Sequence, residues 1–342
     1  MLDETDVVLV GALFFDPRAT FDALGHVAGV SASTASRRLR RLVESRTIRV
    51  VGEVSWHLFS QTYPVHAWIS VSGREYSAVA REVAQLPEAQ HVASLYGREP
   101  VFATLHGQND IDTVRVIDQI HCIDGVSAVY TLPVLQWAVK ASGWNPMLLE
   151  GEHLERAQAI LPLNGPPHLP QITATSELPR TKAEVMALSA LQQDGRLTAT
   201  ELSGVIGASI PTAQRLINRL IDDGWFRPRV ECNLAAIGMG CKFLVRVQSD
   251  PQHTESVLRE FSPHPANRFV TQIAGDSDVF ATGVCRNRHE LTTILNHDFA
   301  AISGLKATQT NIIARDWKRY WTSIDEDGNL GEFTPPALWP AS

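Results

Sequence analysis

The sequence predicts an α+β fold in which two winged helix-turn-helix domains alternate with two ferredoxin-like βαββαβ domains. Three observations carry this prediction. An arginine-rich stretch with helical periodicity follows two shorter helical segments, the next region turns to alternating periodicity, and the whole pattern recurs after a constant shift in numbering. A length of 342 residues also suits several domains.

The arginine-rich stretch runs from Ser33, its expected N-cap, to Arg49 and has two faces when read as a helix. Ala35, Leu39 and Leu42 share one face and are expected to be buried. The other face sets arginines beside a hydroxyl, and guanidinium groups bond bidentately to phosphates and guanine edges. A solvated basic face is the alternative, and the helical context favours DNA. The expected DNA-binding residues are Thr34, Arg37, Arg38 and Arg41.

Two shorter helical segments precede this stretch. The first is Asp6–Phe14 and the second is Phe21–Ala28, with Thr20 as its N-cap. Gly29 supplies the turn, where a positive φ costs little. Three short helices with a glycine-containing turn before the third are the helix-turn-helix pattern. Thr47–Val54 then reads as a wing hairpin or a connecting strand.

Beyond residue 60 the periodicity becomes that of a βαββαβ module. Both predicted helices fall on one face of the predicted sheet, so the other face is expected to bury against a second copy of itself. The expected strands are 63–71, 91–96, 101–106 and 126–136, and the expected helices are 76–83 and 110–120.

The second half of the chain repeats the first with an offset of 178 residues. The offset holds from about Val7 to Phe102 and slips by one near Gly125, which a common fold explains and chance does not. Matching pairs include Asp16 and Asp194, Thr20 and Thr198, Thr34 and Thr212, Arg37 and Arg215, Arg41 and Arg219, Gly97 and Gly275, and Phe102 and Phe280.

These signals divide the chain into six parts. A proline-rich linker with one short helix at 152–160 separates the copies, and an acidic, breaker-rich segment ends the chain as a loose tail. The expected domains are helix-turn-helix 1 at 1–55, ferredoxin-like 1 at 56–142, the linker at 143–178, helix-turn-helix 2 at 179–233, ferredoxin-like 2 at 234–318 and the tail at 319–342.

Composition excludes several classes of protein. The net charge of −7 confines any nucleic-acid surface to a local patch. Apolar runs fall short of the ~18 residues of a membrane helix. The four cysteines form no C-x-x-C pair, which argues against a zinc site or disulfide framework and suits a reducing cytoplasm. The twelve histidines are dispersed, so we expect no metal, no cofactor and no catalytic site.

The order of motifs resembles the Lrp/AsnC, or feast/famine, family of transcription regulators. In the second copy Asp194-Gly195-Arg196, Arg219-Leu220 and Gly275-Asp276-Ser277-Asp278 look like that family's motifs, the last being its G-D-x-D turn. The resemblance implies sequence-specific binding to double-stranded DNA, ferredoxin-like (RAM) domains that pair subunits into homo-oligomers, and an amino acid or related metabolite as effector near the turn. The implied effector residues are Gly275, Asp276, Asp278 and Gly97.

The sequence departs from the family's usual pattern. Two copies occur where usual members have one, so the tandem is expected to act as a dimer within one chain. The second copy has Leu216 and Asn218 where the first has Arg38 and Arg40, so it is expected to read a weaker half-site or to serve as scaffold. Its expected DNA-binding residues are Thr212, Arg215 and Arg219.

Two other interpretations stay open. A fused two-copy chain is also similar to siroheme decarboxylase, an enzyme of alternative heme synthesis on the same fold. His91 and His106 lie on adjacent predicted strands, but the turn at 97–100 leaves no room for the insertion expected of that enzyme. A metabolite-binding or assembly protein with vestigial helix-turn-helix domains is the third interpretation.

Overall fold

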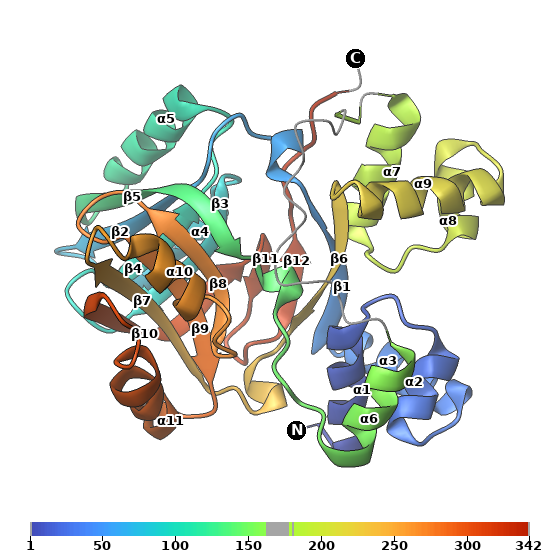
Figure 1. The fold of residues 1–342 in the computed structure, drawn as a ribbon. Coiled ribbons are helices and arrows are strands. Elements are labelled where there is room, and N and C mark those ends of the chain that lie inside the picture. The colour runs from blue at the N-terminus through green and yellow to red at the C-terminus, as the bar shows by residue number, and fades with distance from the viewer. Residues whose placement is uncertain (1, 162–177, 180, 341–342) are drawn as a thin grey trace. The chain divides into compact units, whose positions relative to one another are not determined.

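The computed structural model describes residues 2–161, 178–179 and 181–340, and the chain divides into two compact units (Figure 1). Each unit combines segments from both halves of the sequence. Helical domains from the two copies form unit 1, and the strand-rich modules form unit 2, so the mixed α+β class is as predicted. Unit 1 comprises Met1–Phe59, Ala141–Ile237 and Ala337–Ser342, and unit 2 comprises Ser60–Lys140 and Gly238–Pro336.

Unit 1 contains two three-helix domains, each followed by one strand. Thr20 caps the second helix and Gly29 ends it at a φ of 68°, as predicted. The prediction of Ser33 as the next cap is wrong, because the helix already begins at Ala32 and its cap is Ser31. The elements are α1 (Glu4–Phe15), α2 (Phe21–Ala28), α3 (Ala32–Glu44) and β1 (Ile48–Val54), then α7 (Lys182–Gln193), α8 (Ala199–Ile206), α9 (Ile210–Asp222) and β6 (Phe226–Cys232).

Strands β1 and β6 join the two helical domains. They pair antiparallel along their whole length, from Ile48 opposite Cys232 to Val54 opposite Phe226. Each copy supplies one strand, so the backbone groups of each are satisfied by the other copy and not by a hairpin of its own. Of the two alternatives left by the sequence, the structure therefore has the connecting strand.

Arginines reinforce this junction from both sides. Arg18 donates to the carbonyls of Gly195 and Leu197 at 2.6 and 2.9 Å, and Arg196 donates to those of Pro17 and Ala19 at 2.6 and 2.7 Å. The two residues are equivalent in the repeat, so the contact is reciprocal. Burial lowers the pKa of both guanidinium groups from their ordinary value.

A buried ion-pair triad lies on the β1–β6 ladder. Arg229 donates to Glu53 at 3.0 Å and to Glu231 at 2.6 Å, and all three residues are at most 7% exposed. Such a triad adds little stability over an apolar core, but removal of one member leaves an unpaired buried charge. It therefore fixes the pairing of the two strands.

Part of the expected linker is a helix packed on unit 1. In α6 (Gly151–Ile160) Ala157 is buried, and the His153 ring nitrogen Nδ1 lies 2.7 Å from the Val27 carbonyl of α2. The prolines at 162, 166, 167 and 170 lie outside the described residues. Within the described ranges, short 3-10 turns lie at Trp56–Leu58, Ala141–Gly143 and Ala235–Ile237.

Unit 2 contains two βαββαβ modules whose strands form one sheet. In the described residues this sheet has ten strands, and it closes on itself because β10 pairs with β7 and β3 while β5 pairs with β8. The first module is β2 (Val65–Val71), α4 (Tyr76–Gln85), β3 (Ala89–Leu95), β4 (Val101–Leu105), α5 (Asp110–His121) and β5 (Val126–Val139). The second is β7 (Cys241–Ser249), α10 (Thr254–Phe261), β8 (Asn267–Ile273), β9 (Val279–Cys285), α11 (Arg288–Thr293), the π-helix Ile294–Phe299 and β10 (Leu305–Arg319).

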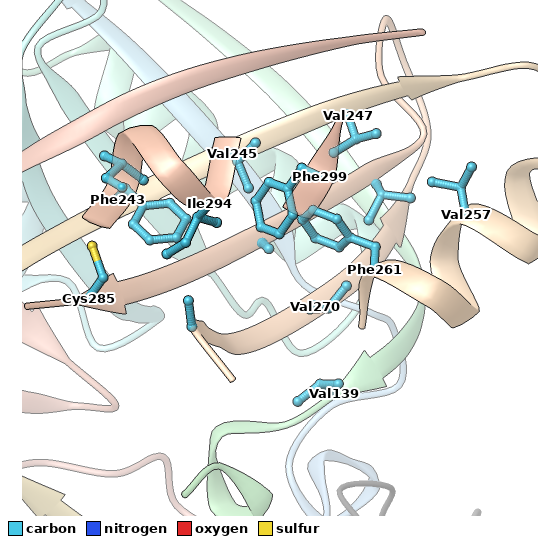
Figure 2. Close-up of a cluster of buried hydrophobic side chains, with 14 of the residues drawn as sticks. Val139, Phe243, Val245, Val247, Val257, Phe261, Val270, Cys285, Ile294 and Phe299 are labelled. Carbon is cyan, nitrogen blue, oxygen red and sulfur yellow. The ribbon is translucent and has the colours of Figure 1, made fainter. Parts of the chain in front are cut away.

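Because side chains alternate between the two faces of each strand, unit 2 has a core on the helix side of each module and a third core between the modules. One face of each module packs on its own helices, as Figure 2 shows for the second module, where Phe261 and Phe299 meet Val245 of β7. The other faces of the two modules pack on each other, and the rings of Phe102 and Phe280 stack with centroids 5.4 Å apart. The bare sheet faces thus bury against one another.

The expected loose tail is instead ordered. Trp321 is 2% exposed, its backbone N donates to the Gln90 carbonyl, and its ring Nε1 donates to the Pro87 carbonyl at 3.1 Å. Asp325 accepts hydrogen bonds that close the following turn. The segment extends the sheet through β11 (Thr322–Ile324) and β12 (Leu330–Phe333). Across the described ranges, no helix is both long and apolar enough to cross a membrane.

Candidate nucleic-acid interface

Helix α3 has the two faces that its sequence predicts. Ala35, Leu39 and Leu42 are 0%, 6% and 3% exposed and pack into the helical core. Arg37 and Arg40 lie on the exposed side of the helix, free to meet a ligand from solvent. Thr34 is half-buried at the N-terminal end, where its backbone N donates to the Ser31 cap. An exposed cationic row at a helix edge is suited to phosphate binding.

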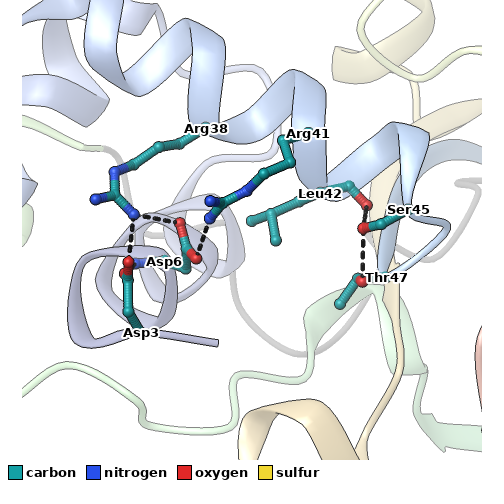
Figure 3. Close-up of polar contacts among 7 residues, drawn as sticks. All are labelled: Asp3, Asp6, Arg38, Arg41, Leu42, Ser45 and Thr47. Atoms are coloured by element: carbon teal, nitrogen blue, oxygen red, sulfur yellow. Dashed lines mark hydrogen bonds and ion pairs between the residues drawn. The ribbon is translucent and has the colours of Figure 1, made fainter. Parts of the chain in front are cut away.

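Two of the predicted DNA-binding arginines are ion-paired within the domain (Figure 3). Arg38 donates from Nη1 to Asp3 at 2.6 Å and to Asp6 at 2.9 Å, and Arg41 donates to the second oxygen of Asp6 at 2.5 Å. Hydrogen bonds to Asp3 and then Asp6 raise the pKa of Arg38, and the bond from Arg38 lowers the pKa of Asp3. These arginines anchor α3 to the start of α1.

The same pairing recurs in the second copy. Arg219 of α9 pairs with Glu184 of α7, and these residues are equivalent to Arg41 and Asp6 in the repeat. Arg215 bonds back to its own helix, through the Pro211 carbonyl at 3.3 Å and the Thr212 hydroxyl at 3.4 Å. The pair between the third and first helices is therefore common to both copies, whereas the additional pairs of Arg38 occur in the first copy, since Leu216 stands at the equivalent position.

The two central turns of the modules share one backbone geometry. Gly275 has a φ of 140° and Gly97 a φ of 137°, values that side chains rarely adopt. An added Cβ at Gly275 would lie 2.2 Å from Leu132 Cδ2, on β5 of the other module, whereas at Gly97 it would lie 3.3 Å from Asn311 Nδ2 on β10. Each turn is thus packed against a strand of the opposite module.

The aspartates of the Gly275 turn have different surroundings. Asp278 accepts from the backbone N and hydroxyl of Ser249 at 2.7 and 3.0 Å, which fixes the end of β7. Asp276 is exposed, with Oδ1 accepting from the Ser277 hydroxyl and lying 4.0 Å from Arg246 Nη1. Burial, and then the hydrogen bond with Asp276, raise the pKa of Tyr130. Asp276 is therefore the more exposed aspartate of the turn.

The sequence interpretation missed Arg246, which lies behind this turn. Its side chain is 5% exposed, and its guanidinium carbon sits 4.5 Å from the Trp68 ring centroid and 5.7 Å from that of Tyr130. It also donates to the Gln309 side chain. The signal in the sequence was an arginine at the position that Trp68 occupies in the first copy.

Two buried or half-buried histidines of unit 2 have hydrogen-bonding partners in the strands around them. His91 Nε2 lies 3.0 Å from Asp316 Oδ1, and His66 lies between the hydroxyls of Thr104 and Thr271 at 3.1 and 3.4 Å. In the part of the chain that the structure describes, no three His, Cys, Asp or Glu side chains group to hold a metal ion. The connection from β3 to β4 is short, as the sequence predicts.

Three family models match segments of the chain. An AsnC-type helix-turn-helix domain matches residues 2–43, a winged helix-turn-helix DNA-binding domain matches residues 181–227, and an Lrp/AsnC ligand binding domain matches residues 242–321. The matches cover the helical domain of each copy and the second ferredoxin-like module.

Curated relatives match at the level of a single copy. The HTH-type transcriptional regulator FL11 of Pyrococcus horikoshii is 26% identical over 136 residues, which cover 40% of this chain and 90% of that protein. An uncharacterized HTH-type transcriptional regulator of the same organism is 27% identical over 127 residues, covering 37% of this chain and 80% of that protein. Among solved structures, the siroheme decarboxylase NirDL matches with a TM-score of 0.57 and 15% identity over 93% of both chains, which shows a shared fold alone.

Proposed function

We propose that this chain is a DNA-binding transcription regulator of the Lrp/AsnC family, in a tandem form whose two copies act on one duplex. The observation that carries the proposal is the exposed cationic edge of α3, with Arg37 at its centre, on the third helix of a helix-turn-helix. In this architecture the third helix enters the major groove.

The first copy is proposed as the stronger DNA contact. Arg37 is exposed and ready for phosphates or base edges, with Thr34 beside it. Arg38 and Arg41 reach DNA only by exchanging their aspartate partners for phosphate, so part of their Coulombic gain is offset. In the second copy Thr212, Arg215 and Arg219 fill the equivalent positions with fewer charges around them.

A fixed pairing of the two helical domains supports action on one duplex. The β1–β6 ladder and the reciprocal contacts of Arg18 and Arg196 join them within unit 1. A joined pair of recognition helices suits half-sites separated by about one helical turn of DNA, or a multiple of it.

The test is a fluorescence anisotropy titration with duplex DNA from upstream of the protein's own coding sequence. Arg37→Ala is expected to weaken binding and to reduce the salt slope by about 0.9, the value for one phosphate contact. Arg215→Ala is its matched control in the second copy and is expected to cost less. Binding that is the same for the parent and for an Arg37→Ala, Arg41→Ala double variant would reject the assignment.

Regulation by a small effector is the second part of the proposal. Gly275, Asp276 and Asp278, with Gly97 in the first copy, are proposed to form or shape the site, since Asp276 is open to an ammonium group and turn amides suit a carboxylate. A thermal-shift screen of amino acids tests this. A hit that is indifferent to Asp276→Ala would remove the turn from the site.

Assembly and location are proposed on the family's pattern. Homo-oligomers would add pairing between chains to the pairing of modules seen within one chain, and a cytoplasmic location would give access to chromosomal DNA. A tetrapyrrole absorption spectrum with and without siroheme separates the regulator from the enzyme alternative, because a regulator of this kind leaves the siroheme spectrum unchanged.

A further inference from the structure

A pocket of about 250 Å³ lies beside α3, and all of its lining residues belong to unit 1. Its floor is apolar and comes from Leu13, Leu39, Ile48 and Val50. The volume is just below the roughly 300–1,000 Å³ of pockets that hold drug-sized ligands, so the pocket suits one ring with a short chain.

The rim of the pocket combines an aromatic wall with two cations. Phe21 is 41% exposed and Val43 is 51% exposed, and both line the pocket. The guanidinium carbon of Arg196 lies 5.4 Å from the Phe21 ring centroid. Arg40 approaches from α3 and Glu44 follows it one turn later, so the three charged side chains leave one net positive charge at the rim.

We propose that this pocket binds a small monocarboxylate with an apolar ring or branched chain. The apolar body would cover Phe21 and Val43, and the carboxylate would meet the guanidinium groups of Arg40 and Arg196. A single negative charge matches the net charge of the rim, and guanidinium groups bind carboxylates with well-defined geometry.

The two copies differ at the residues that would make this site. The repeat places Ala199 at the position of Phe21 and Asn218 at the position of Arg40, so the second copy lacks both the ring and the charge. Residues of the second copy can therefore be placed at the equivalent positions of the first copy to test the pocket.

Binding of the carboxylate would also affect the edge of α3 that is proposed to face DNA. Arg40 lies one turn from Arg37 on the same helix, so a carboxylate that holds Arg40 withdraws it from phosphate. This coupling rests on the proposed DNA-binding function, whereas the binding of the carboxylate does not.

The experiment measures binding of 3-phenylpropionate to the full chain by saturation-transfer NMR and calorimetry, with 3-phenylpropan-1-ol as the uncharged control. We expect a Kd on the order of 1 mM for a ligand of this size. The alcohol should bind about tenfold more weakly, because it lacks the charge-assisted hydrogen bonds.

Variants locate the site. Phe21→Ala and Arg40→Asn should each weaken binding about tenfold, whereas Arg46→Asn, which removes the same charge outside the pocket, should leave it unchanged. Absence of binding, equal binding by the parent and both pocket variants, or loss of binding only on Asp276→Ala would each overturn the proposal. Saturating ligand should weaken DNA binding by the parent. Bound ligand with unchanged DNA affinity would keep the pocket and reject its link to Arg40.

Discussion

Replacing both Arg38 and Arg41, which hold α3 on α1, should lower the free energy of unfolding by more than the sum of the two single replacements. The Asp6 side chain is 3% exposed and has both Arg38 and Arg41 as partners, whose side chains are 26% and 59% exposed. Arg41→Ala should cost only about 0.5 kcal/mol, because its partner bond is largely solvated. Arg38→Ala should cost roughly 1 kcal/mol, since that pair is better shielded.

The double variant should cost about 3 kcal/mol, because it leaves the buried Asp6 carboxylate without a cation. The excess over the two single changes, roughly 1.5 kcal/mol, is the coupling energy of a double-mutant cycle. Differential scanning calorimetry of the full chain measures it, at about 2–4 °C for each kcal/mol in a unit of this size.

Two controls make the cycle specific to Asp6. Arg37→Ala removes an exposed arginine of the same helix and should leave the melting temperature unchanged. In an Asp6→Asn background the Arg38 and Arg41 changes should become additive, because no buried carboxylate remains to be orphaned. Additivity in the parent background, within about 0.5 kcal/mol, would refute the role assigned to Asp6.

Three further predictions concern the scaffold. Arg229→Met leaves Glu53 and Glu231 buried without their cation and should destabilise unit 1 by about 3–5 kcal/mol, measured by calorimetry; an unchanged transition would contradict the triad. Arg18→Ala removes two charge-assisted bonds to the Gly195 and Leu197 carbonyls and should cost roughly 2–3 kcal/mol by the same measurement, with the exposed Arg46→Ala as a silent control. Burial holds the pKa of His66 well below its ordinary value, and burial likewise lowers the pKa of His106 to about 3. The unfolded chain then binds more protons than the folded one, so the free energy of unfolding should fall as the pH drops below about 6.5, by up to about 1.4 kcal/mol per pH unit for each histidine. Urea unfolding between pH 7 and 5 checks this, and a His66→Gln variant with the parent's pH slope would contradict it.

Local sequence patterns predicted the helices and strands better than they predicted which strands pair with one another. The apolar spacing of Ala35, Leu39 and Leu42 identified the buried face of α3, because helical periodicity reports burial directly. The cap was misplaced because Ser31 and Ser33 have the same chemistry, and only the position of the preceding turn decides between them. The pairing of β1 with β6 and of β5 with β8 joins residues far apart in sequence, which no local period encodes.

The sequence identified the residues of the candidate site, but it did not identify their ion-pair partners. The arginine row was found, but the acidic partner of Arg41 lies at the start of α1, beyond the window of a helical pattern. The tail was misread because acidic residues and glycine outweighed the aromatic side chain of Trp321, whose burial orders the segment. Arg246 was not predicted, because its stacking partner Trp68 belongs to the other copy and lies 178 residues away in sequence.

Hydroxyl-radical footprinting of the full chain on its own upstream DNA tests the central idea most directly. Two protected half-sites on one face of the duplex are expected, about one helical turn or a multiple apart. Arg37→Ala should weaken protection of one of them, and Arg215→Ala should weaken protection of the other to a smaller extent. Protection of a single half-site that neither change affects would contradict the proposal that both copies bind one duplex.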